Sequence, residues 1–217
     1  MLMENIRRGA KKHRALMMIV VAGLCLSLLL GVIFTGGGRR QSEVTLAQQI
    51  AAYEGLVKDA RDKLAESPKD YSASGSLGDL LMELSLLHKQ NNAPEKTITA
   101  AAEAAASYET SLANAPEGLS KIGQARIVSK LAMAYEFAGN TESAESNFKK
   151  SLETGEHDWQ VERGYIDYLF RKPDYAAALA YAQSLIGVYN TGTTELTELN
   201  NAIAYLGVRV GEEGMAK

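Results

Sequence analysis

The sequence is poor in the residues that build reactive or cross-linked sites. Its 217 residues include one cysteine, Cys25, and three histidines, His13, His88 and His157. A single thiol excludes an intrachain disulfide, so packing has to stabilise the fold. The histidines have no metal-ligand spacing with other residues, and no G-x-S-x-G, P-loop or G-x-G-x-x-G motif occurs. We therefore predict a protein that is not an enzyme, with no catalytic, cofactor-binding or metal-binding residues.

The polar residues that remain have simpler interpretations. His13 belongs to a basic segment, His88 stands near the predicted end of a helix, and His157 lies in a predicted turn. We expect these histidines to be solvated or to cap helix ends. Glu142, Glu145, Glu153 and Glu156 alternate with apolar positions and are typical of a solvated helix face. An activity that depends on His88 or His157 remains an alternative.

A long charge-free run near the N-terminus is the strongest single feature. No charged residue occurs from Ala15 to Gly38, and residues 15–35 are almost all apolar. A helix of that length spans roughly 30 Å, the thickness of the hydrocarbon core of a bilayer. We predict a transmembrane helix at 15–35, preceded by a basic flank (1–14) and followed by a flexible linker (36–42).

Cleavage of this segment is the alternative, and it would give a secreted soluble protein. A cleaved signal usually has an apolar region of 7–15 residues and a small-residue cleavage site. The run here is longer, and only Thr35 and Gly37 offer a weak match. Cys25 suggests a lipid-modified cysteine, but Leu24 before it is not small, so we interpret Cys25 as an apolar residue facing lipid.

Flanking charges predict the orientation in the cell membrane. Five basic residues and one acidic residue precede the span, whereas Arg39 and Arg40 follow it. This excess places the N-terminus in the cytoplasm and the C-terminal domain outside it. Gly23, Ser27 and Gly31 form a small-residue face, through which two copies of the span could pair as a homodimer.

The composition after residue 40 favours an acidic helical domain. Residues 41–217 carry 16 basic and 25 acidic residues. This balance argues against binding to nucleic acid, which needs a basic surface. Abundant alanine and only four prolines favour helix, and apolar residues recur at helical spacing. The predicted helices are 43–66, 71–90, 94–114, 120–138, 141–153, 158–171, 173–188 and 194–212, so the helical domain covers 43–212 and a tail covers 213–217.

One pattern in this domain consists of Leu131, Ala132, Tyr135, Gly139, Ala144, Phe148 and Ser151, and a weaker copy follows at Tyr168, Ala177, Tyr181, Ser184 and Leu185. Half of the pattern precedes them at Ala104, Tyr108, Ser111, Leu112 and Pro116. In these residues the domain resembles the tetratricopeptide repeat (TPR) family. Small residues at 132 and 144 allow close helix crossing, Tyr135 and Phe148 fill the space between the helices and the next repeat, and Gly139 ends its helix in a left-handed conformation.

The resemblance implies hairpins at 71–118, 125–157 and 158–190. Helix 43–66 is then either an extra packing helix or a continuation of the stalk, and 194–212 is a terminal cap. The predicted fold is all-α: an N-terminal transmembrane helix followed by a TPR-like α-hairpin superhelix.

Proteins of the TPR family mostly bind a peptide or helix of another protein in a groove lined by the first helix of each hairpin. The corresponding residues here are Lys130, Met133, Arg163, Asp167 and Arg171. Tyrosines also gather in the last third, with Trp159, and suit either a repeat core or an interface. We therefore expect a membrane-anchored scaffold or assembly factor that binds another protein outside the cytoplasm.

Overall fold

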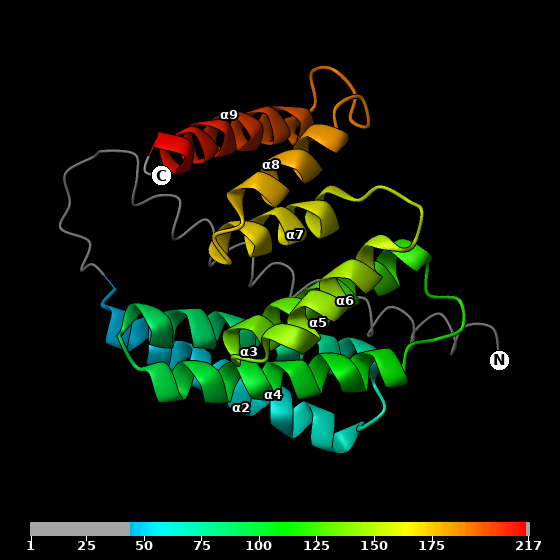
Figure 1. Cartoon of the computed structure of the whole chain (residues 1–217). Helices are drawn as coiled ribbons and strands as arrows, with labels where there is room; N and C mark the ends of the chain where they lie inside the picture. Colours follow the sequence, from blue (N-terminus) through cyan, green and yellow to red (C-terminus); the bar gives the residue numbers. More distant parts are fainter. Residues whose placement is uncertain (1–43, 216–217) are drawn as a thin grey trace, which may run out of the picture. The chain divides into compact units, whose positions relative to one another are not determined.

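The computed structural model describes residues 44–215, and every regular element in this range is an α-helix (Figure 1). The all-α prediction is confirmed for these residues. The predicted flank (1–14), span (15–35) and linker (36–42) lie outside the described residues, as does the small-residue face of the span. Among the helices that are described, none has both the length and the apolar character needed to cross a bilayer.

The helices follow the predicted ranges closely. They are α2 (Leu46–Glu66), α3 (Tyr71–Gln90), α4 (Pro94–Ala113), α5 (Lys121–Phe137), α6 (Thr141–Leu152), α7 (Trp159–Arg171), α8 (Tyr175–Ser184) and α9 (Thr194–Met215). Most begin after a residue whose side chain accepts a backbone N–H of the first turn. Such caps are Thr45, Asp70, Ser120, Asn140, Asp158 and Asp174. These caps satisfy donors that the first turn leaves free, and so fix where each helix begins.

Glycines with positive φ follow the C-terminal ends of helices α5 and α8. Gly139 follows α5 with φ +83°, so the predicted left-handed glycine is confirmed. Gly187 has φ +91°, and the chain leaves the helix before it, so α8 ends at Ser184 instead of the predicted 188. At the other end of the domain, α9 continues to Met215, three residues beyond the predicted helix end at 212.

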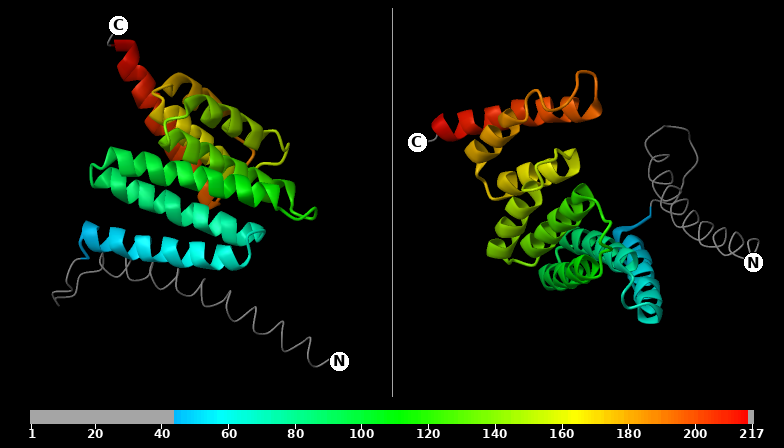
Figure 2. Two further views of the ribbon diagram at one scale, coloured as in Figure 1. Left: turned by 90° about the horizontal axis from the view of Figure 1, so that it is seen from below. Right: turned by 90° about the vertical axis from the view of Figure 1, so that its right-hand side faces the viewer.

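The helices stack as hairpins in chain order (Figures 1 and 2). The hairpins are α3–α4, α5–α6 and α7–α8, and α9 packs against α8. We call α3, α5 and α7 the first helices and α4, α6 and α8 the second helices. Helix α2 packs against α3 and buries Ile50 and Val57 in the core there. It is therefore an extra packing helix, which was one of the two predicted alternatives.

Small residues let the helices of a hairpin approach closely. Ala101, Ala104 and Ala105 of α4 are almost fully buried against α3. A Cβ atom added to Gly78 would lie 2.7 Å from Cε1 of Tyr108, so the tyrosine ring occupies the space that a side chain at 78 would need. This contact joins the two helices of the first hairpin face to face.

A second hydrophobic core is formed by residues of helices α5 to α9. Ala132, Ala144 and Phe148 are fully buried in it, which confirms the roles predicted for them. The ring of Phe148 stacks on that of Tyr168 with 4.8 Å between centroids, and this contact joins α6 to α7. Tyr135 is half-buried and packs against this core as well as against the core of the first hairpin. Its hydroxyl donates to Glu109 of α4, a contact with the preceding hairpin that was not predicted.

Candidate functional site

The five residues predicted to line a groove all lie on two first helices. Lys130 and Met133 belong to α5, whereas Arg163, Asp167 and Arg171 belong to α7. Met133 is half-buried and packs against both hydrophobic cores. The four charged side chains keep between 30% and 56% of their surface exposed. Their accessibility is compatible with binding, and their contact with a partner stays a prediction.

The three predicted cations already have partners on a neighbouring helix of the stack. Lys130 Nζ lies 2.8 Å from Asp79 Oδ1 of α3. Arg171 donates to both carboxylate oxygens of Glu136 in α5, from Nε at 2.6 Å and from Nη2 at 2.7 Å. The sequence predicted the helices of these residues but not the pairs, because the partners lie 35 and 51 positions away.

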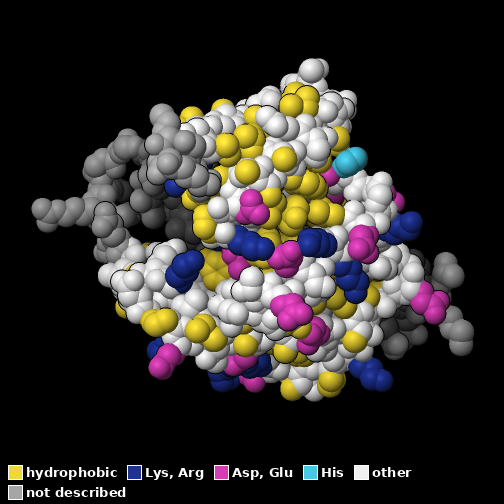
Figure 3. Space-filling view, viewed as in Figure 1, with side chains coloured by type: hydrophobic (Ala, Val, Ile, Leu, Met, Phe, Trp, Pro, Cys, Tyr) yellow, Lys and Arg dark blue, Asp and Glu magenta, His cyan; other side chains and the backbone are white. Residues whose placement is uncertain are grey.

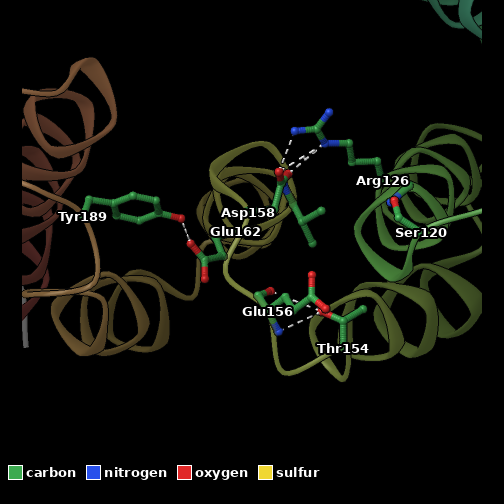
Figure 4. Close-up of polar contacts among 9 residues, drawn as sticks. Ser120, Arg126, Thr154, Glu156, Asp158, Glu162 and Tyr189 are labelled. Carbon is green, nitrogen blue, oxygen red and sulfur yellow. Dashed lines mark hydrogen bonds and ion pairs between the residues drawn. The ribbon is translucent and has the colours of Figure 1, made fainter.

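Two further pairs complete this series. Arg163 Nη1 lies 2.8 Å from Glu198 of α9, and Glu198 also accepts from Trp159 Nε1 at 2.7 Å. Arg126 of α5, which sequence reasoning missed, binds Asp158 at the start of α7 at 2.6 Å (Figure 4). Helices α3, α5, α7 and α9 are thus joined in succession by pairs of opposite charge. On the face drawn in Figure 3, charges of both signs lie side by side and do not segregate.

Burial and neighbouring charges shift the pKa values of two of the predicted groove residues, Arg171 and Asp167. Partial burial opposes the charge of Arg171, but the Glu136 carboxylate outweighs it and raises the pKa of Arg171 above its usual value. Partial burial raises the pKa of Asp167, and the guanidinium groups of Arg171 and Arg163 offset part of that effect. The contact with Glu136 therefore favours the charged form of Arg171.

A hollow of about 360 Å³ opens between α5 and α7. Met133, Phe148 and Val161 give it apolar walls, and Ser129, Gly164, Gln160, Arg126 and Lys130 complete its lining. A Cβ atom on Gly164 would lie 2.9 Å from Ser129 Oγ, so glycine is what allows the two first helices to approach here. The size and lining of the hollow suit an apolar side chain of a bound segment.

A second hollow, of about 530 Å³, continues toward α9. Trp159, Tyr189, Arg163, Glu195 and Glu198 are among the residues that line it. The Trp159 and Tyr189 rings meet edge to face at 5.6 Å, so two members of the aromatic group singled out in the sequence do lie together. Aromatic groups with polar tips of this kind are common at binding surfaces.

Glu162 is a buried carboxylate that sequence reasoning did not identify. It is 3% exposed, and one of its oxygens lies 2.6 Å from His157 Nδ1. The other oxygen accepts a hydrogen bond from the Tyr189 hydroxyl (Figure 4). Burial, followed by the hydrogen bond to Glu162, raises the pKa of Tyr189. Glu162 thereby ties both the α6–α7 and the α8–α9 connections to α7. His157 is exposed as expected, but it has this specific partner.

His88 is a correction to the prediction of a solvated or capping residue. It is only 4% exposed, and its Nδ1 atom has no hydrogen-bond partner. Burial, and then the charge of Lys96, lower the pKa of His88 below 6.5, so the imidazole is neutral at pH 7. Between residues 44 and 215, no three histidine, cysteine or acidic side chains form a group that could hold a metal ion.

Comparison with protein-family models, with curated proteins and with solved structures found no match for this chain.

Proposed function

We propose that the chain is a membrane-anchored, TPR-like scaffold or assembly factor that holds another protein outside the cytoplasm. The single observation that carries the binding role is the apolar hollow between α5 and α7, beside Met133. It lies between first helices, where the resemblance to the TPR family places the ligand groove. The repeat-like stacking of three hairpins supports the same interpretation.

The ion pairs favour one kind of bound segment over others. Arg126 is engaged by Asp158, whose side chain is only 10% exposed, and Lys130 by Asp79. A ligand that recruited Arg126 through its own carboxylate would leave Asp158 without its counterion, which is unfavourable for a buried charge. The favoured ligand is therefore a segment that inserts an uncharged apolar side chain between α5 and α7.

A site-specific photocrosslinker tests the binding role. The full chain would carry benzoylphenylalanine at Met133 in its native membranes, with a matched chain labelled at Ile98. Ile98 is 49% exposed but lies on α4, a second helix. We expect a protein adduct from position 133 that is absent from position 98. Equal labelling at both positions, or none at 133, would contradict the proposed groove.

The anchor is tested separately by extraction and protease access. We expect the chain to stay in membranes washed with alkaline carbonate, because the charge-free run 15–35 is long enough to span a bilayer. In spheroplasts, added protease should remove the helical domain while leaving the N-terminal flank protected. A chain that is released by carbonate, or shortened at its N-terminus on mass spectrometry, would favour the cleaved alternative.

A further inference from the structure

A cavity of about 120 Å³ lies beside the buried side chain of Glu162. It is bordered by the end of α6, by the connection from α6 to α7, and by residues of α5, α7 and α8. The apolar side chains of Ile122, Ala125, Leu152 and Val161 form part of its wall. Since a single water needs only about 10–15 Å³ of such space, the cavity has room for a larger group.

The charged groups that border this cavity are mainly negative. Glu156, Asp158 and Glu162 supply carboxylates, and no lysine or arginine of residues 44–215 borders it. Asp158 is already engaged, because it pairs with Arg126 and caps the start of α7. Glu162 is 3% exposed, and its only ion-pair partner in the described range is His157. Helix α6 also ends beside the cavity, and the C-terminal end of a helix carries partial negative charge. A cation in the cavity would therefore compensate a buried charge.

Three side chains at the cavity can accept further hydrogen bonds. The Tyr181 hydroxyl makes no hydrogen bond to another described side chain, and burial, followed by the charge of Glu162, raises the pKa of Tyr181, so the hydroxyl stays protonated at neutral pH. Ser151 Oγ donates to the carbonyl oxygen of Phe148 at 2.7 Å, so its lone pairs remain as acceptors. A carboxylate has about four acceptor positions, and the two contacts of Glu162 described above leave the others available.

We propose that this cavity binds a protonated primary amine, with the ammonium group against Glu162 and the alkyl part against the apolar wall. An ammonium group has three donors and no acceptor, which matches one carboxylate and two hydroxyl oxygens. An anion would meet carboxylates without a lysine or arginine to bind it. A divalent metal ion would lack ligands, because no three histidine, cysteine or acidic side chains of residues 44–215 are grouped to hold one. A partner's lysine side chain and a free alkylamine share the required chemistry.

Titration of the full-length chain in detergent with methylammonium chloride, followed by saturation-transfer NMR, tests the site. Sodium chloride keeps the ionic strength constant. We expect Glu162→Gln to lower the affinity at least about tenfold, because it removes a hydrogen bond to a charged group. The matched control is Glu153→Gln, an exposed carboxylate at the end of α6 that does not border the cavity, and its affinity should be unchanged. Tyr181→Phe keeps the ring and removes one acceptor, so it should weaken binding about threefold; circular dichroism checks that each variant is folded.

A second probe, Nα-acetyl-lysinamide, carries the same ammonium group on a lysine side chain. Binding of this probe at least as tight as that of methylammonium would assign the cavity to a partner's lysine, whereas binding of methylammonium alone would assign it to a small free amine. Tetramethylammonium has no N–H donor and should not compete with either probe. Equal affinity of the wild type, Glu162→Gln and Tyr181→Phe would overturn the proposal, as would displacement of methylammonium by sodium ions. Absence of saturation transfer in the wild type would mean that only water fills the cavity, and would overturn it as well.

Discussion

Replacing Gly78 with alanine tests the close-packed hairpin most directly. The new Cβ atom would lie 2.7, 2.8 and 2.9 Å from Cε1, Cδ1 and Cζ of Tyr108. The ring cannot turn aside freely, because Tyr108 is 2% exposed and its hydroxyl donates to Asp79 at 2.7 Å. Either the ring or helix α4 has to move. We therefore expect Gly78→Ala to destabilise the domain.

Two opposing effects determine how much Gly78→Ala changes the free energy of unfolding. Overpacking a well-filled core costs about 1–3 kcal/mol, and three contacts below 3 Å on a buried ring place Gly78→Ala near the upper end. Alanine is about 1 kcal/mol more favourable than glycine inside a helix. The net expectation is a loss of about 2 kcal/mol in the free energy of unfolding.

The same substitution at Gly55 is the matched control, because a Cβ atom there meets nothing within 4 Å. Gly55→Ala should raise the free energy of unfolding by about 0.5–1 kcal/mol through helix propensity alone. Urea unfolding of the full chain in detergent, followed by circular dichroism at 222 nm, measures both changes. If Gly78→Ala were as stable as the wild type, the close contact between α3 and Tyr108 would be wrong.

Two further predictions concern the polar side chains of His88 and Arg171. Because the pKa of His88 is lowered below 6.5, the unfolded chain binds more protons than the folded chain just below pH 6.5, so the free energy of unfolding falls as the pH drops through that value. His88→Leu should remove this part of the pH dependence, measured as unfolding midpoints from pH 8 to 5. An unchanged slope in the variant would contradict the prediction. Arg171→Ala should lower the free energy of unfolding by about 1–2 kcal/mol, because it removes a bidentate pair with Glu136. Arg171→Lys should lie between Ala and wild type, since lysine cannot make the paired contact, and equal stability of all three chains would mean that the pair contributes nothing.

Most of the helical framework could be predicted from the sequence because its signals are local. Helix starts follow from caps such as Asp70 and Ser120, which bind backbone groups two or three residues away. The buried faces follow from apolar spacing, as with Ala144 and Phe148. The end of α8 was misplaced because the apolar pattern continues through Leu185 to Val188, and the positive φ of Gly187 interrupts it.

The candidate site could be predicted only in part, because its contacts join distant parts of the chain. Helix position alone placed Lys130 and Arg171 on the first helices. Whether their charges were free depended on partners in other hairpins, and no local signal specifies those. Glu162 was not singled out in the sequence, because its partner Tyr189 is 27 residues away and comes beside it only in the folded chain.

The pairing of charges also affects how partner binding can be selective. Exposed pairs such as Lys130–Asp79 contribute little to stability, typically below about 1 kcal/mol. Lys130 nevertheless lines the hollow where the proposed ligand would dock, and its pairing with Asp79 fixes a cation that would otherwise attract acidic segments. An acidic ligand has to displace Asp79 or Glu198, whereas an apolar side chain can enter beside Met133 without breaking a pair. The paired charges would thus disfavour acidic ligands at the hollow and leave shape and apolar contact as the main basis for recognition.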